Sequence, residues 1–276
     1  MTTRLSDPLV SIITPYRNSE EFLPSLALNL QAQTYPHWEC ILIDHHSSDL
    51  GPKIAIELAR RDNRFHSIRE SDPRPLPALP RNTGLAKARG ELICFLDVDD
   101  LWHPLKLERQ LLFHTCNNLE FSVTSYGRFR GDHAAGNGLL PRQWRPWYPP
   151  KSMSRSRLLW DNPIPMLTVM LNKELLSGEE HAGGPFALVH HEDYLLWLTL
   201  WLNYPDLRYG RLDEVLAFHR RHKRSITASR WRMAAWTYGV HRAHGESIAG
   251  AALRSARLGV VHLSRSASSW LFASNG

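Results

Sequence analysis

The chain has 276 residues, of which 43% are hydrophobic and 22% are charged, enough apolar surface for one large domain or two modest ones. The net charge of +6 and the isoelectric point near 9.4 predict affinity for anions such as nucleic acid, acidic lipid head groups or nucleoside diphosphates. Ten Lys and Arg residues and a single acid lie in 219–276, so the remainder is nearly neutral, which argues against a surface built for nucleic acid.

The first half of the chain alternates short apolar runs with segments of helical period. Strands are predicted over 9–15, 38–44, 65–69 and 92–96; helices are predicted after Ser19, over 52–60 and up to Arg89. The proline-rich segment 72–80 is expected to be neither helix nor central strand. This alternation of strand and helix is the signature of a parallel sheet with crossover helices.

The second half is less regular. We expect a helix from His103, strands over 121–126, 167–171 and 212–218, a helix over 190–201, and a basic helical segment from Trp231. Between two of these strands, the 26 residues 127–152 show no periodicity. A connection of this length is expected to be a lid or a binding loop.

Three carboxylates follow the buried strand 92–96: Asp97, Asp99 and Asp100. Side chains alternate on an extended chain, so Asp97 and Asp99 project to the same side, at the edge of the sheet where open α/β folds bind ligands. Paired carboxylates suit a hard divalent cation, although a charged turn that caps the next helix would look the same. Asp44 also ends a predicted strand, and this second carboxylate favours a ligand site.

The three cysteines, Cys40, Cys94 and Cys116, have no spacing typical of a zinc site, and their odd number gives no disulfide framework. The N-terminus lacks the pattern of a signal peptide. No window of about 18 residues is free of charge. We therefore expect no transmembrane helix and a reducing, cytoplasmic setting.

Six segments now occur in an order that resembles the nucleotide-sugar glycosyltransferases of family 2: 10–18, 43–49, 81–90, 95–100, 191–197 and 218–225. The resemblance implies an α/β GT-A fold, with a Rossmann-like, mostly parallel central sheet flanked by helices and followed by a C-terminal helical tail. It also implies a domain over 1–229, with a nucleotide-sugar half to about 125 and an acceptor half over 126–229. The basic helical extension then covers 230–276.

The resemblance places the donor nucleotide against Thr14, Tyr16, Asp44 and Arg81. A tyrosine ring can stack on a base, and a carboxylate can accept a hydrogen bond from an imide or amine of the base. A UDP-sugar is the first expectation. The family usually continues the equivalent of Asp44 with Asp-Gly, whereas this chain has His at 45–46, which leaves the choice of nucleotide open.

The resemblance assigns Asp97 to the ribose or the metal shell, Asp99 to direct coordination of Mn²⁺ or Mg²⁺, and His222 to a third metal ligand or a phosphate donor. The metal would stabilise the charge on the departing diphosphate. Asp193, the second acid of a Glu-Asp pair, is the expected general base for the acceptor hydroxyl. Family 2 members typically invert the anomeric centre in one displacement.

The sequence thus predicts metal-dependent transfer of a sugar to a glycan or lipid-linked acceptor in cell-surface polysaccharide or glycan synthesis, with no nucleic acid partner. A non-catalytic nucleotide-sugar-binding protein is the alternative that the change at 45–46 leaves open. A sugar-nucleotide pyrophosphorylase is a weaker alternative, because it would need a glycine-rich loop and 14–18 contains no Gly. The tail after Ser229 suits either a helix packed on the domain or a peripheral contact with the inner face of a membrane.

Overall fold

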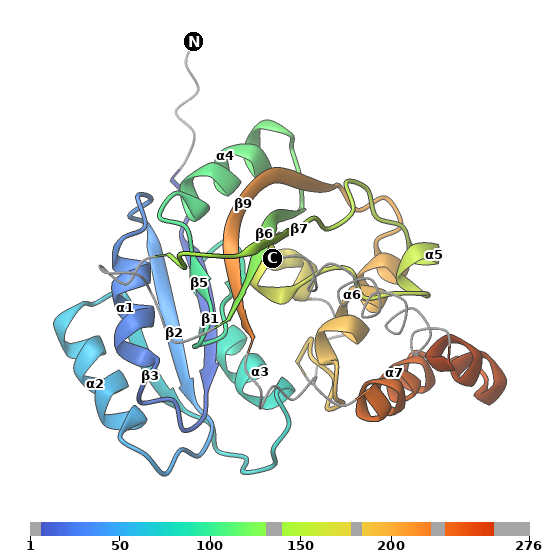
Figure 1. Cartoon of the computed structure of the whole chain (residues 1–276), viewed down its shortest axis with the longest axis horizontal. Helices are drawn as coiled ribbons and strands as arrows, with labels where there is room; N and C mark the ends of the chain where they lie inside the picture. The colour runs from blue at the N-terminus through green and yellow to red at the C-terminus, as the bar shows by residue number, and fades with distance from the viewer. Residues whose placement is uncertain (1–6, 131–139, 178–183, 222–229, 257–276) are drawn as a thin grey trace, which may run out of the picture.

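The computed structural model describes residues 7–130, 140–177, 184–221 and 230–256. Within them, nine strands form one mixed sheet in the order β3-β2-β1-β4-β8-β6-β9-β5, with β7 paired to β6 (Figure 1). The strands are β1 (Val10–Tyr16), β2 (Trp38–Asp44), β3 (Phe65–Arg69), β4 (Leu92–Phe95), β5 (Leu101–Trp102), β6 (Phe121–Arg130), β7 (Arg145–Trp147), β8 (Val169–Asn172) and β9 (Tyr209–Arg221). The helices are α1 (Leu23–Gln31), α2 (Gly51–Arg61), α3 (Ala78–Lys87), α4 (Lys106–Cys116), α5 (Arg155–Leu158), α6 (Glu192–Asn203) and α7 (Arg230–Ala243), with short 3-10 turns η1 (Met166–Thr168) and η2 (Lys173–Leu176).

Strands β3, β2, β1 and β4 form the parallel half, as the sequence predicts. All seven residues of β2 are buried, because helices cover both faces of the sheet. Alternate residues face the two layers: Ile12 and Leu42 pack in the core beneath α1 and α2, while Ile13 and Ile43 pack beneath α3 and α6. The predicted α/β architecture is therefore confirmed, with its core divided between the two faces of the sheet.

The other half of the sheet is mixed. Strand β8 runs antiparallel to both β4 and β6, whereas β6 and β9 are parallel. The prediction that 127–152 has no regular structure is wrong for 127–130 and 145–147, because β6 continues to Arg130 and β7 pairs with it. Backbone pairing with β9, rather than apolar periodicity, extends β6 through these polar residues.

Helix α3 begins inside the proline-rich segment. Residues 72–77 are irregular, as expected, but Ala78 opens the helix and Pro80 lies in its first turn. The prediction that no residue of 72–80 is helical is therefore wrong for its last three positions. The first turn of a helix has no internal acceptors for its N–H groups, so a proline there costs no hydrogen bond.

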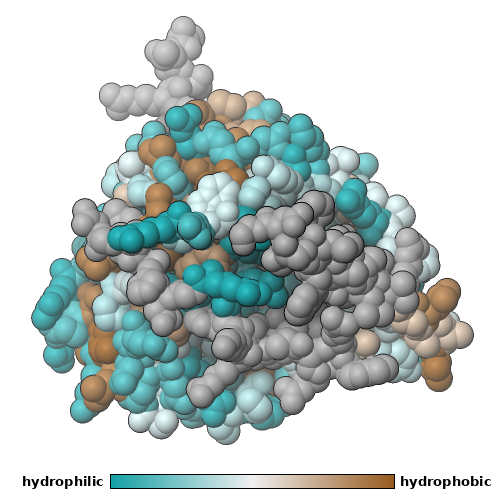
Figure 2. Space-filling model, viewed as in Figure 1, coloured by the Kyte–Doolittle hydropathy of each residue, from teal (hydrophilic) through white to brown (hydrophobic). Residues whose placement is uncertain are grey.

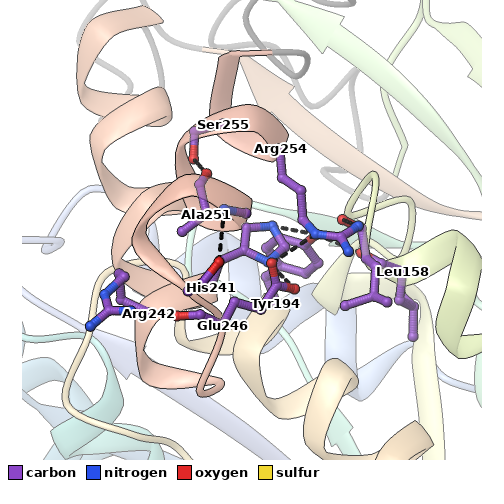
Figure 3. Close-up of polar contacts among 11 residues, drawn as sticks. Leu158, Tyr194, His241, Arg242, Glu246, Ala251, Arg254 and Ser255 are labelled. Atoms are coloured by element: carbon purple, nitrogen blue, oxygen red, sulfur yellow. Dashed lines mark hydrogen bonds and ion pairs between the residues drawn. The ribbon is translucent and has the colours of Figure 1, made fainter.

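The C-terminal segment packs on the domain through α7 and the helical residues 248–256 (Figure 3). His241 is fully buried, with Nε2 at 3.4 Å from the Tyr194 hydroxyl of α6 and Nδ1 at 3.1 Å from the Glu246 carboxylate. Arg254 donates to Glu246 at 2.7 Å and to the Leu159 carbonyl at 3.2 Å. Packing against α6 is thus the state of the tail up to residue 256, and the membrane contact stays a prediction. In the part of the chain that the structure describes, the helices are too short or too polar to cross a bilayer.

One lysine lies wholly inside the sheet–helix interface. Lys106 of α4 is 0% exposed, with Nζ at 3.3 Å from Cys94 Sγ and 3.7 Å from the centre of the Trp102 ring. Burial lowers the pKa of this amine, since no water solvates its charged form. Among the described residues, the amine thus contacts a thiol and a ring face, and no carboxylate pairs with it as a buried charge would require.

Replacing Lys106 by Met should raise the free energy of unfolding by about 1–3 kcal/mol, because the thioether fills a similar volume without a buried amine. Urea denaturation measures the change. Lys53→Met on the exposed side of α2 is the control, expected within about 0.5 kcal/mol of the wild type. A Lys106→Met protein less stable than the wild type would show that the amine is favourable where it lies.

Candidate active site

The carboxyl ends of the parallel strands meet at one edge of the sheet, and β2 brings Asp44 there beside Tyr16 of β1. Asp44 is 3% exposed and accepts a hydrogen bond from the Ser47 amide at 2.9 Å. Arg69, at the end of β3, places its Nε 3.8 Å from the same carboxylate. Asp44 thus holds its own turn while remaining at the edge where ligands bind in open α/β sheets.

The loops after β1 and β2 are tied together. The Asn18 amide donates to Ser47 Oγ at 2.9 Å, and the Asn18 side chain accepts from the Ser48 amide at 2.8 Å. Both Asn18 (φ 48°) and His46 (φ 58°) adopt the left-handed backbone conformation. His46 stands where the family resemblance expects Gly. The turn therefore keeps the left-handed conformation that glycine adopts easily, although residues with a side chain seldom adopt it.

The turn after β4 carries the predicted acidic cluster. Asp97 and Asp99 are partly exposed, whereas Asp100 is 2% exposed and accepts the Arg220 amide at 2.8 Å. Arg220 Nε also donates to the Asp99 carbonyl at 2.8 Å. Burial, with the charges of Asp99 and Asp97, raises the pKa of Asp100. Asp100 is therefore the structural member, which fixes β9 against the turn.

Arg81 of α3 joins two acidic groups that lie far apart in sequence. Its guanidinium donates to Asp97 Oδ1 at 2.9 Å and to Glu192 Oε1 at 2.5 Å. Glu192 opens α6, and both the Arg81 and Glu192 side chains are buried. Burial raises the pKa of Glu192 to about 7, against the attraction of Arg81 and with a further rise from Asp193. The contact places the acid pair of α6 beside the turn after β4.

The raised pKa of Glu192 predicts a pH-dependent stability. The unfolded carboxyl has an ordinary pKa of 4.5, so between about pH 4.5 and 7 the folded state holds a proton that the unfolded state has lost. Stability from this group is therefore present at low pH and falls as pH rises through that window, by at most about 1.4 kcal/mol per pH unit.

Urea denaturation at several pH values tests this prediction. Glu192→Gln should remove the fall, while Glu57→Gln on the surface of α2 should keep it. An unchanged profile in Glu192→Gln would contradict it.

Asp193 lies next to this pair in a different environment. It is partly exposed, its Oδ2 accepts from Asn162 at 3.4 Å, and its Oδ1 accepts from the Tyr194 amide at 2.7 Å. Behind it, the Trp236 ring of α7 stacks on His190 with centroids 4.5 Å apart. Asp193 therefore presents a carboxylate to solvent from a helix end that the C-terminal segment braces.

The other predicted residues have mixed placements. Thr14 is fully buried and Tyr16 is 3% exposed in the core beneath α1 and α2. Burial and the neighbouring Asp44 raise the pKa of Tyr16. Base stacking on Tyr16 stays a prediction, for which this conformation offers little ring surface. His222 lies outside the described residues.

Two contacts at the candidate site could not be predicted from the sequence. The Arg81–Glu192 pair spans 111 positions, and no spacing rule links residues so far apart. Arg220, two residues after the predicted strand 212–218, fixes the turn at Asp99 and Asp100. That place after a predicted strand was the only signal in the sequence for this role.

Asp97 and Asp99 are the two described residues of the predicted metal site. The Asp97 side chain remains 48% exposed although Arg81 holds one of its oxygens. Within the described residues, no group of three or more His, Cys, Asp or Glu side chains has the arrangement of a metal centre. Mg²⁺ and similar ions need only one or two carboxylates when phosphate and water complete the shell. The residues thus fit an ion that a bound diphosphate helps to hold.

A mixed sheet with carboxylates at the end of its parallel half, facing an acid pair on a later helix, defines a glycosyltransferase of GT-A fold. The chain belongs to glycosyl transferase family 2, whose sequence profile matches residues 11–172. It is 31% identical to the putative teichuronic acid biosynthesis glycosyltransferase TuaG of Bacillus subtilis, over 85% of this chain and 88% of the relative. It is 32% identical to the UDP-Glc:alpha-D-GlcNAc-diphosphoundecaprenol beta-1,3-glucosyltransferase WfgD of Escherichia coli, over 71% of each chain.

Solved structures share the fold. The S. aureus TarS fragment 1–349 in complex with UDP-GlcNAc has a TM-score of 0.63 and 20% identity, over 84% of this chain and 65% of the fragment. The chain spans 38% of the longer TarS chain. The mannosyltransferase PcManGT of Pyrobaculum calidifontis, in complex with GDP-Man and Mn²⁺, has a TM-score of 0.62 and 18% identity, over 96% of this chain and 81% of that one.

Proposed function

We propose that this enzyme transfers a sugar from a nucleoside-diphosphate sugar to a hydroxyl of a glycan or lipid-linked acceptor, with inversion, in the synthesis of a cell-surface polysaccharide. The observation that carries the proposal is Arg81, which holds Asp97 and Glu192 together. It brings the candidate donor edge and the candidate base into one site. The relatives support the same reaction: WfgD is named for a UDP-glucose donor and a diphosphoundecaprenol-linked acceptor, and TuaG for teichuronic acid biosynthesis.

The donor would lie along the strand ends. Asp44 of β2 and, once their buried side chains are exposed, Thr14 and Tyr16 of β1 would flank the nucleotide. Arg81 would contribute positive charge near the diphosphate. Asp97 and Asp99 would hold Mn²⁺ or Mg²⁺, which supplies Lewis-acid stabilisation of the leaving group. The complexes of TarS with UDP-GlcNAc and of PcManGT with GDP-Man and Mn²⁺ support this choice. A UDP-sugar remains our first candidate.

Asp193 would act as the general base. Its carboxylate takes the proton of the acceptor hydroxyl as that oxygen forms a bond to the anomeric carbon and the bond to the diphosphate breaks. Glu192 is held by Arg81 and is buried, so Asp193, which is partly exposed, is the better placed of the two for an incoming hydroxyl. A single displacement with one base produces inversion.

A thermal-shift screen of nucleotide sugars tests the proposal. The preferred donor at 100 times its dissociation constant should stabilise the protein by about 2.7 kcal/mol, with Mn²⁺ or Mg²⁺ present and to a much smaller degree with a chelator. Free sugars are the control and should not shift the melting temperature. If no nucleotide sugar raises the melting temperature under either condition, the donor assignment is wrong.

A further inference from the structure

Four arginines lie on one face of the ribbon formed by β7, β6 and β9. Arg128 and Arg130 are two residues apart on β6; Arg145 of β7 is the register partner of Arg128, and Arg221 of β9 is that of Arg130. Residues two apart on a strand share a face, as do register partners. These four side chains form what we call the arginine cluster. Arg128 is partly buried and the other three are exposed.

The arginine cluster has no acidic partner in the described part of the chain. Other arginines pair with carboxylates, as Arg64 does with Asp62 and Arg89 with Glu39. Arg128 instead donates to the hydroxyl of Tyr126, at 2.7 and 3.1 Å. Gathered positive charge of this kind is relieved when an anion binds.

The arginine cluster and the strands proposed to bind the nucleotide, β1 and β2, lie on opposite sides of β4 and its acidic turn. In the strand order, β4 lies between β1 and β2 on one side and β6 and β9 on the other. Arg220, whose Nε contacts the Asp99 carbonyl, directly precedes Arg221. Figure 2 shows hydrophilic surface at the centre of the same face, in the region where Figure 1 draws β6 and β9. An anion on the cluster would therefore lie beside the acidic turn, away from Asp44.

Aromatic rings accompany the arginines. The Arg128 guanidinium lies 4.3 Å from the centre of the Trp147 ring. This cation–π contact orients the guanidinium over the ring face. Trp144 and Tyr148 alternate with Arg145 and Trp147 along this segment, and the Trp144 ring packs on Phe218, away from the cluster. The partly exposed Trp147 is therefore the ring beside the arginines. Guanidinium groups bind phosphate through paired hydrogen bonds, and a ring face offers an apolar surface to a sugar or an alkyl chain. The combination fits a ligand that carries phosphate next to such a group.

We propose that the arginine cluster binds a phosphate or diphosphate group of the acceptor. The acceptor of this enzyme is then anionic, with its phosphate held by β6, β7 and β9 while its hydroxyl reaches the base. The inference rests on the proposed function, since it assumes sugar transfer to an acceptor. It adds the chemical class of that acceptor and the residues that recognise it.

Calorimetric titration with decyl diphosphate tests the proposal on the full chain, with UDP and Mn²⁺ present in excess so that the donor site is filled. Decyl glucoside, of equal chain length and no charge, is the comparison ligand. In Arg130→Gln/Arg221→Gln, the dissociation constant for decyl diphosphate should rise at least about tenfold. In Arg60→Gln/Arg109→Gln, which removes two exposed charges from α2 and α4, it should not change.

Three results would overturn the proposal. The wild type could bind decyl diphosphate and decyl glucoside equally well, or the wild type and the Arg130→Gln/Arg221→Gln variant could bind decyl diphosphate equally well. Third, the variant could lose as much affinity for UDP as it loses for decyl diphosphate. The last would assign the cluster to the donor diphosphate. None of these titrations requires turnover, so their failure leaves sugar transfer intact. A wild-type protein that binds no UDP would instead count against the proposed function.

Discussion

Replacing Asp193 by Asn is expected to slow sugar transfer by about 10²- to 10⁴-fold, the usual contribution of a general base. The amide keeps one oxygen, which can still accept from the Tyr194 backbone amide, and gives up only the longer 3.4 Å contact from Asn162, but it cannot take a proton from the acceptor. Donor affinity should therefore stay within about twofold of the wild type. Initial rates at saturating donor, with donor affinity measured by calorimetry, separate the two effects.

Asp206→Asn is the matched control, because Asp206 is an exposed aspartate in the loop after α6. It should transfer sugar at the wild-type rate. Wild-type activity in Asp193→Asn would remove Asp193 as the base. Glu192 would then be the next candidate, and its burial against Arg81 would have to open during the reaction.

Replacing Asp99 by Ala is expected to weaken metal-dependent binding of the donor by at least about 100-fold. Changes to residues that merely support a metal ligand already cost about 10- to 100-fold, and here one of the two candidate ligands among the described residues is lost. UDP titration with Mn²⁺ and with a chelator measures the effect. With the chelator, wild type and variant should bind UDP equally weakly.

Asp213→Ala removes an aspartate of β9 whose side chain is 53% exposed and pairs with Lys151 and Arg211, so it should leave metal-dependent binding unchanged. If Asp99→Ala retained the full metal effect, the ion would have to be held elsewhere. The buried Asp100 is not an equivalent substitute, because its carboxylate already accepts the Arg220 amide.

The parallel half of the fold could be predicted because its strands bury both faces. A run such as Trp38–Asp44 is apolar almost throughout, and its strand has the predicted bounds. The end of β6 could not be predicted, because Arg128 and Arg130 belong to no apolar pattern. They adopt a strand conformation because they pair with β9, some 90 residues away. Long-range pairing of polar segments leaves little trace in local sequence.

The candidate site divides in the same way. Asp44 and Asp97 follow predictable strands, so their common edge could be expected. Arg81 and Glu192 meet because α3 and α6 pack on the same face of the sheet, which depends on topology that the sequence pattern does not specify. Tyr16 has the right sequence position for a nucleotide contact, yet its ring turns into the core.

The position of β9 at the centre of the mixed half bears on how the chain folds. Strand β9 pairs with both β6 and β5. Leu101 of β5 therefore cannot form its strand pair until Phe218 of β9 is in place. Contacts of such high sequence separation form late and slowly. The parallel nucleotide half can assemble from neighbouring segments alone, whereas the acidic turn gains the Arg220 contacts only when nearly the whole domain has been synthesised. Chains that stop short of β9 would leave β5 and β6 with open edges, a state prone to aggregation.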